Sequence, residues 1–315
     1  MYSCQVPVVL IFFNRADKFE KVFSKVREAK PRKLYLVQDG PRNDSDAQKI
    51  MECRKIAENI DWDCEVIKDY SEINLGCGVR PQSGITNALK NEESVIILED
   101  DCVPSNSFFP YCEEMLEKYK DDERICYVSG LNHFEEWDCG DSDYFFTKAG
   151  AIWGWATWAR SWNKYYDYYM KSANEQVLSL VAGQITNKYI AKSRVEAWKK
   201  AKLSLDSGEK LSYWDIQWGF VKYSQSMLVI VPRYNQIHNI GIGATSTHAM
   251  SIKKSGFRKY KTFVFIPTHE LEMPLKHPKC CICDTKYDDL VYKCSAGNPI
   301  RRSVAKIVKK ILRRK

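Results

Sequence analysis

Three consecutive carboxylates, Glu99, Asp100 and Asp101, come directly after the apolar run Val95-Ile96-Ile97-Leu98. Adjacent acids repel one another unless a cation or hydrogen-bond donors neutralise them. Mg²⁺ and Mn²⁺ prefer oxygen ligands and are usually held by one or two carboxylates together with substrate phosphates. The triplet therefore predicts a divalent cation held against a phosphorylated ligand. The alternative is a polar turn in which Asp100 or Asp101 caps a helix that begins near Ser107.

The residues before the triplet predict alternating strands and helices. Strands are predicted over 7–13, 34–37 and 64–67, helices over about 17–29 and 45–60, and a further helix to about 91 after a loop with two glycines at 73–80. This alternation predicts a parallel sheet with right-handed crossovers. Ligands of such sheets bind at the carboxyl ends of the strands. The acidic triplet, at the end of a fourth strand, lies at that edge.

The second half of the chain is rich in aromatic residues. A helix over 108–119 and a strand over 125–130 precede Trp153, Trp155, Trp158 and Trp162. Some of these tryptophans could line a cleft, because aromatic faces suit the apolar faces of sugars or bases; others are expected in the core. A later run, 213–218, places the Asp215 carboxylate among aromatic side chains. Without a repeat or a low-complexity linker, the chain is predicted to form one continuous domain.

Composition predicts a folded globular protein. The 315 residues are 44% hydrophobic and 13% aromatic, which is enough for a sizeable core. No stretch approaches the roughly 18 consecutive apolar residues of a membrane span, and the N-terminal run carries no basic leader, so we expect a cytoplasmic protein. Of the twelve cysteines, Cys280, Cys281, Cys283 and Cys294 crowd near the end. They predict free thiols in a mobile segment, with a structural zinc as the alternative.

The net charge of +8 lies in the C-terminal tail. Residues 300–315 hold eight Lys and Arg and no acid, which leaves 40 basic against 40 acidic residues in the rest of the chain. Apolar residues of the tail form one helical stripe opposite its cations, a pattern typical of a helix on an anionic membrane surface. A disordered tail, or a helix docked on protein, is the alternative. The neutral body argues against nucleic acid as a partner.

Five short motifs together resemble a known family. They are 12–15 (Phe-Phe-Asn-Arg), 37–40 (Val-Gln-Asp-Gly), 96–105 around the acidic triplet, 154–158 (Gly-Trp-Ala-Thr-Trp) and 214–215 (Trp-Asp). In this order they resemble GT-A fold glycosyltransferases, in particular bacterial sugar transferases similar to animal N-acetylglucosaminyltransferase I, over about residues 5–250. The resemblance implies an α/β fold with a Rossmann-like, mostly parallel sheet flanked by helices and an acceptor-side α+β half, followed here by the C-terminal amphipathic helix.

The resemblance also implies a division of labour at the site. Asp101 would bind Mn²⁺ or Mg²⁺ at the diphosphate of a nucleotide sugar, with Glu99 and Asp100 contacting ribose, sugar or metal-bound water. Arg15 and Asp39 would hold the nucleotide, with Asp39 accepting from the N3–H of uracil. The loop residues Asn74 and Arg80 would lie beside the base and phosphates. The sugar or acceptor pocket would be lined by Trp153, Trp155 and Trp214. For Arg80, a surface ion pair is the alternative.

Two further residues receive roles from the resemblance. Asp215 is predicted to be the general base that deprotonates an acceptor hydroxyl in an inverting displacement. It departs from the animal motif, in which two acids follow the Trp, since Ile216 comes next here; a helix cap is the alternative. His248 ends a glycine-rich segment, 241–248, and is predicted to complete the metal shell, with an exposed loop histidine as the alternative.

The sequence therefore predicts a metal-dependent inverting glycosyltransferase that moves a sugar, most simply from a UDP-sugar, to a cell-surface glycan or lipid-linked acceptor. The domain is expected over 1–270, with a nucleotide half (1–104) and an acceptor half (105–270), followed by a Cys-containing connection (271–299) and the tail (300–315) at the inner face of the membrane. A sugar-phosphate nucleotidyltransferase and a noncatalytic carbohydrate-binding protein are the alternatives. The first usually has a glycine-rich, basic segment after its first strand, and residues 14–17 contain no glycine.

Overall fold

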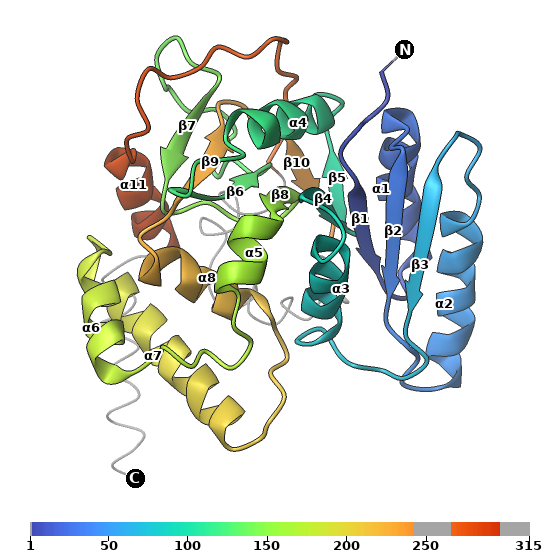
Figure 1. The fold of residues 1–315 in the computed structure, drawn as a ribbon, viewed down its shortest axis with the longest axis horizontal. Helices are drawn as coiled ribbons and strands as arrows, with labels where there is room; N and C mark the ends of the chain where they lie inside the picture. Colours follow the sequence, from blue (N-terminus) through green and yellow to red (C-terminus); the bar gives the residue numbers. More distant parts are fainter. Residues whose placement is uncertain (1, 242–265, 297–315) are drawn as a thin grey trace.

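A computed structural model describes residues 2–241 and 266–296, and within these ranges the main sheet has eight strands in the order β3-β2-β1-β4-β8-β6-β9-β7 (Figure 1). The strands are β1 (Val8–Phe12), β2 (Lys33–Gln38), β3 (Glu65–Tyr70), β4 (Ser94–Glu99), β6 (Ile125–Ser129), β7 (Tyr144–Thr147), β8 (Trp155–Trp158) and β9 (Leu228–Pro232). β5 (Cys102–Pro104) and β10 (Ile237–Asn239) form a separate antiparallel pair.

The predicted parallel half is confirmed. β1 lies parallel to both β2 and β4, and β2 lies parallel to β3. In the second half, β8 runs antiparallel to β4 and β6, and β7 runs antiparallel to β9, while β6 and β9 are parallel. The fold is thus a mixed α/β sheet, mostly parallel in strand direction and flanked by helices, as the sequence predicts.

Helices cover both faces of the sheet (Figure 1). They are α1 (Ala16–Ala29), α2 (Asp44–Ala57), α3 (Arg80–Leu89), α4 (Phe108–Lys118), α5 (Ala159–Tyr165), α6 (Glu175–Gly183), α7 (Lys188–Asp206), α8 (Asp215–Ser224) and α11 (Thr285–Ala296). Side chains of β1 alternate between two cores, because successive residues of a strand point to opposite faces. Val9 and Ile11 pack with α3, α5 and α8, whereas Val8 and Leu10 pack with α1 and α4.

The end of the described chain is part of the same fold. Helix α11 contacts β7 and α7, and Tyr287 of this helix is fully buried. The Asp288 carboxylate accepts hydrogen bonds from the Thr147 hydroxyl and from the backbone N–H groups of Lys148 and Ala149, at 3.1 and 3.0 Å for the two amides. These bonds fix the segment that contains the late cysteines, which are not disulfide-bonded.

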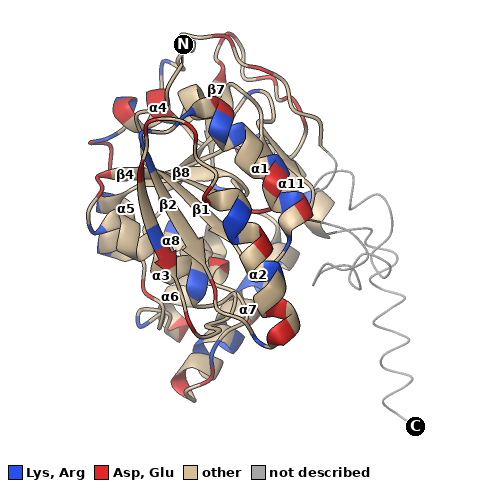
Figure 2. Ribbon diagram, turned by 90° about the vertical axis from the view of Figure 1, so that its right-hand side faces the viewer, with Lys and Arg blue, Asp and Glu red and all other residues tan. Residues whose placement is uncertain are grey.

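Charge is mixed along the described helices, with both signs on most of them (Figure 2). This agrees with the formally neutral composition of the chain outside residues 300–315. The predicted amphipathic helix over 300–315 lies outside the described residues. Within the described ranges, no helix is both long enough and apolar enough to cross a bilayer.

Candidate active site at the carboxyl ends of β1, β2 and β4

Arg15 and the acidic triplet meet at one edge of the sheet because their strands are parallel neighbours. Glu99 is the last residue of β4 and pairs in register with Ile11 of β1, so the residues that follow both strands leave the sheet together. Arg15 precedes α1 and reaches both aspartates. Its Nε lies 3.2 Å from Asp100 Oδ2, its Nη2 lies 2.9 Å from Asp101 Oδ2, and Nη2 also pairs with Asp100 Oδ1.

The electrostatics of the cluster show a shortage of positive charge. Desolvation, followed by the charges of Asp101, Asp100 and Asp215, raises the pKa of Glu99 to about 8, with Arg15 acting in the opposite direction. Burial also raises the pKa of Asp100, against the lowering effect of Arg15. Burial opposes the charge of Arg15, but the two aspartates outweigh it and raise its pKa. One guanidinium thus does not neutralise three carboxylates, and a further cation would relieve their repulsion.

The donor set fits a hard cation without enclosing one. Carboxylate oxygens are the ligands that Mg²⁺ and Mn²⁺ prefer, and one or two of them suffice when a phosphorylated ligand supplies the others. Among the described residues, no three His, Cys, Asp or Glu side chains are arranged to hold a metal ion by themselves. Asp101 would supply a carboxylate ligand in that arrangement, and His248, the other predicted ligand, lies outside the described residues.

Asp101 is held by the chain that follows β10. Its backbone carbonyl accepts from the N–H of Ile240 at 2.8 Å, and Asn239 Nδ2 lies 3.4 Å from its Oδ1. A Cβ added to Gly241 would lie 2.0 Å from Asp101 Oδ2. Lys18, in the first turn of α1, donates to the Gly241 carbonyl at 3.2 Å. Gly241 is the first residue of the glycine-rich segment 241–248, but no sequence pattern predicts that it lies against Asp101.

Gly241→Ala is therefore expected to displace the Asp101 carboxylate and weaken Mn²⁺ binding in the presence of UDP by about 10- to 100-fold. The matched control is Gly219→Ala, because a Cβ at Gly219 in helix α8 meets open space. Mn²⁺ affinity is measured by electron paramagnetic resonance of the free ion, and the fold of each variant by circular dichroism. Equal affinities in Gly241→Ala and wild type would contradict the expectation that a side chain at position 241 displaces the Asp101 carboxylate from a bound cation.

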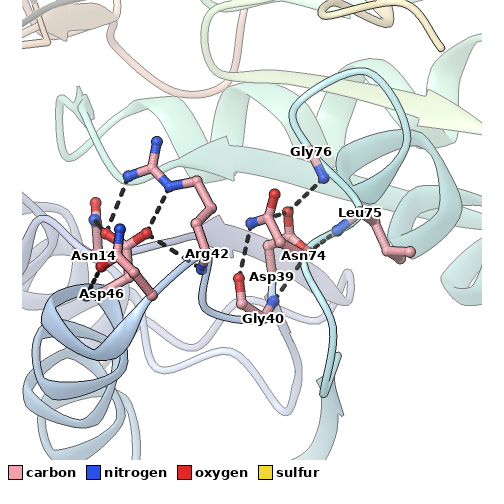
Figure 3. A network of polar contacts seen from close by, with 9 residues as sticks. Asn14, Asp39, Gly40, Arg42, Asp46, Asn74, Leu75 and Gly76 are labelled. Atoms are coloured by element: carbon pink, nitrogen blue, oxygen red, sulfur yellow. Dashed lines mark hydrogen bonds and ion pairs between the residues drawn. The ribbon is translucent and has the colours of Figure 1, made fainter.

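Asp39 organises the loop beside the site (Figure 3). Its Oδ1 accepts from the N–H groups of Gly40 and Leu75, at 2.9 and 2.8 Å. Its Oδ2 accepts from the N–H of Gly76 at 2.8 Å and from Asn74 Nδ2 at 3.1 Å. A carboxylate has about four lone-pair sites, and these four donors fill them. The predicted bond from Asp39 to the N3–H of uracil would have to displace one of these donors, so we infer that Asp39 positions the loop instead.

Asp39→Asn is expected to loosen residues 74–76, because the amide NH₂ would face N–H donors that the carboxylate now accepts from. We expect a loss of about 1–3 kcal/mol in the free energy of unfolding and faster hydrogen exchange at the amides of Leu75 and Gly76. Denaturant unfolding and hydrogen exchange measured by mass spectrometry test this, with the exposed Asp63→Asn as control. Unchanged exchange at Leu75 and Gly76 would contradict a positioning role.

Arg80 is placed by the same loop, in the interior of the protein. Its Nε donates to the Gln38 carbonyl at 3.1 Å, and its Nη2 pairs with Asp69 at 2.7 Å. Its side chain is only 5% exposed, so neither a phosphate contact nor the alternative surface ion pair describes its position. Asn74 contributes to the site through Asp39 and through a 2.8 Å bond to the Gly40 carbonyl.

The same loop packs on the segment that leads to Asp215. A Cβ at Gly78 would lie 1.8 Å from the carbonyl oxygen of Leu211, so the loop packs directly on the segment before helix α8. Asp215 is the first residue of α8 and is exposed. Its charge raises the pKa of Glu99 and that of Cys77, so it lies on the same side of the molecule as the triplet. The N-cap position of α8 is held by Trp214, so Asp215 lies one residue beyond the position that the alternative of a helix cap requires, and its role as a base stays a prediction.

Two of the three tryptophans predicted to line a pocket are core residues. Trp155 and Trp214 are 1% and 4% exposed and stack with ring centroids 5.9 Å apart. They cannot present a face to a sugar without opening the hydrophobic core, because their neighbours Trp162 and Trp218 are equally buried. The predicted pocket role therefore does not fit Trp155 and Trp214. Trp153 is partly buried, and its role stays a prediction.

Comparisons with known proteins return structural neighbours only. No family model and no curated protein matches the chain. A solved UDP-glucose pyrophosphorylase in complex with UDP-glucose shares 10% identity over 74% of this chain and 93% of its own, at a TM-score of 0.35. The 4-diphosphocytidyl-2C-methyl-D-erythritol synthase of Anaerococcus prevotii shares 13% identity over 78% of this chain and 93% of its own, at 0.36. An apo UDP-glucose pyrophosphorylase shares 9% identity over 74% and 93%, at 0.35.

The prediction of an inverting glycosyltransferase is corrected by this comparison. The neighbours are nucleotidyltransferases, which correspond to the stated alternative and not to the main prediction. The burial of Trp155 and Trp214 agrees with the correction, since it removes two residues of the predicted acceptor pocket. These neighbours are 9–13% identical to this chain, and the residues of the site decide which reaction it can support.

Proposed function

We propose that this protein is a metal-dependent sugar-phosphate nucleotidyltransferase, which joins a nucleoside monophosphate to a sugar phosphate. The observation that carries the proposal is the cluster of Arg15, Asp100 and Asp101 at the carboxyl ends of β1 and β4. Carboxylates there would hold Mg²⁺ or Mn²⁺, and Arg15 would bind phosphate, which its planar guanidinium suits. A nucleoside triphosphate and a nucleotide sugar are then the expected ligands.

This reaction depends on positive charge that stabilises the phosphates more than on a general base. A phosphate oxygen of the sugar phosphate attacks the α-phosphorus of the nucleoside triphosphate, the bond to the β-phosphate oxygen breaks, and pyrophosphate leaves with its electron pair. The nucleophile is already an anion, so no hydroxyl has to be deprotonated. Catalysis then consists mainly of positioning and of electrostatic stabilisation of the phosphates. A bound divalent cation would neutralise charge on the transferred phosphoryl group.

Two features of α1 and its start support phosphate binding. Helix α1 has fourteen residues and begins at this edge of the sheet, and helix N-termini favour anions through their N–H groups and dipole. Lys18 adds a second cation in its first turn, 3.2 Å from the Gly241 carbonyl. Arg15 and Lys18 supply the basic character of a segment after the first strand, although that segment has no glycine.

The test is pyrophosphorolysis. The protein is incubated with a panel of nucleotide sugars, inorganic pyrophosphate and Mg²⁺ or Mn²⁺, and ³¹P nuclear magnetic resonance follows the products. The proposal expects a nucleoside triphosphate and a sugar phosphate, formed only when both pyrophosphate and metal are present. Release of a nucleoside diphosphate would mean cleavage at the sugar carbon and would overturn the proposal, as would the absence of any triphosphate product across the panel.

Membrane association is a separate proposal that rests on residues 300–315 and on their sequence alone. It concerns where the enzyme works and does not bear on the reaction. A divalent cation is likewise proposed from the donor set, and the nucleobase is left to the panel, because the four donors around Asp39 remove the argument for uracil.

A further inference from the structure

Arg15 occupies the position of a counter-cation within the acidic cluster. It bridges Asp100 and Asp101, whose side chains are only 5% and 14% exposed, whereas its own is 35% exposed. The guanidinium therefore pairs with the carboxylates that the proposed metal would need, and it does so from the solvent side. A divalent cation bound at Asp101 would lie beside this guanidinium and would be repelled by it.

We propose that Arg15 competes with the divalent cation for Asp101, and that the competition ends when a phosphorylated ligand offers Arg15 another anion. Metal and phosphate then bind together, and each binds weakly alone. The identity of the phosphorylated ligand rests on the proposed function, whereas the competition between Arg15 and the cation does not.

Three properties of the site carry this inference. First, a guanidinium stays charged at every accessible pH, so only another anion can draw it from the aspartates. Second, phosphate accepts the same paired N–H···O bonds as a carboxylate, so the exchange of partners keeps the hydrogen bonds of Arg15. Third, Lys18 and the N-terminus of α1 lie at the same edge, so an arriving phosphate meets further favourable charge.

The expected consequence is a reciprocal coupling between metal and nucleotide. If the nucleotide strengthens metal binding by some factor, the metal strengthens nucleotide binding by the same factor. Removal of Arg15 should strengthen binding of the metal alone and reduce the coupling.

Arg15→Gln and Arg15→Lys test the competition through binding of Mn²⁺ alone, measured by electron paramagnetic resonance of the free ion. Without nucleotide, Arg15→Gln should bind Mn²⁺ on the order of tenfold more tightly than wild type. Arg15→Lys keeps the cation and should stay closer to wild type. The control is Arg27→Gln, which removes an exposed ion pair with Asp61 in the last turn of α1, at the other end of the helix from Arg15, and should leave Mn²⁺ binding unchanged. Circular dichroism establishes that each variant is folded.

Unchanged or weaker Mn²⁺ binding by folded Arg15→Gln would overturn the competition, as would no binding by any variant. In a second measurement, UDP is added and the ion that UDP chelates in protein-free solution is subtracted. UDP should strengthen Mn²⁺ binding more in wild type than in Arg15→Gln, and an equal gain in both would overturn the coupling. The measurement without nucleotide needs no turnover, so a failure of pyrophosphorolysis leaves it standing and the two proposals fail separately.

Discussion

Asp101→Asn is expected to lower metal-dependent pyrophosphorolysis by about 10²-fold or more, the order of loss seen when one electrostatic contact to a transition state is removed. Asparagine has nearly the same shape, so the close contact with Gly241 and the 2.8 Å bond from Ile240 N–H to the Asp101 carbonyl are kept. The variant loses the negative charge that would hold the cation. It also loses the ion pair between Arg15 and the Asp101 carboxylate. We therefore expect the rate of pyrophosphorolysis to fall while the protein stays folded.

Initial rates with saturating nucleotide sugar and pyrophosphate, measured across a range of Mg²⁺ concentrations, check this expectation. The matched control is Asp61→Asn, because Asp61 pairs with an arginine as Asp101 does but is exposed and remote. That variant should keep the wild-type rate. An Asp101→Asn enzyme with undiminished turnover would remove Asp101 from the proposed metal site.

Trp162→Ala is expected to destabilise the protein by about 3–5 kcal/mol, the usual cost when a buried tryptophan is removed from a core. Trp162 is 1% exposed and stacks on Tyr166 with ring centroids 4.1 Å apart and planes inclined by 7°. Its ring lies 4.9 Å from that of Trp218. Its Nε1–H donates to the Thr86 hydroxyl of α3 at 2.9 Å, so the substitution also leaves that partner without its donor.

The free energy of unfolding in urea measures this effect, and the slope of the transition shows whether the folded state stays compact. Tyr169→Ala is the control, because Tyr169 is a large aromatic residue of the same region that is 57% exposed. Its expected change is within about 0.5 kcal/mol, as for most surface substitutions. A loss below 1 kcal/mol for Trp162→Ala would mean that the tryptophan cluster is not a packed core.

The acidic triplet and the first four strands illustrate what a linear pattern can predict. The run Val95–Leu98 has no polar residue, which suits a strand buried on both faces, and the strand is β4. Strands and helices alternate up to this point, which predicts parallel neighbours and therefore a shared edge for Arg15, Asp39 and the triplet. These inferences succeed because hydrophobic period and chain order are properties of the sequence itself.

The environments of the same side chains depended on contacts between distant segments. Asp39 has four donors because residues 74–76 fold back over it, and Asp101 is confined by Gly241, 140 residues later in the sequence. The sequence does not decide the role of the tryptophans either, because an indole ring suits both a hydrophobic core and a sugar-binding surface. The packing of Trp155 on Trp214 places both rings in the core. A sequence pattern does not show which distant residues will contact a given side chain.

The alternation of strands and helices up to Glu99, the parallel half and the position of the acids at a strand end thus follow from the linear pattern alone, because hydrophobic period and strand order are properties of the chain. The fold, by contrast, places Arg15 between Asp100 and Asp101, pairs Arg80 with Asp69, and buries Trp155 and Trp214 in the core. Burial and charge pairing depend on all the groups that surround a side chain. Those groups come from segments that the fold, and not the chain order, brings together.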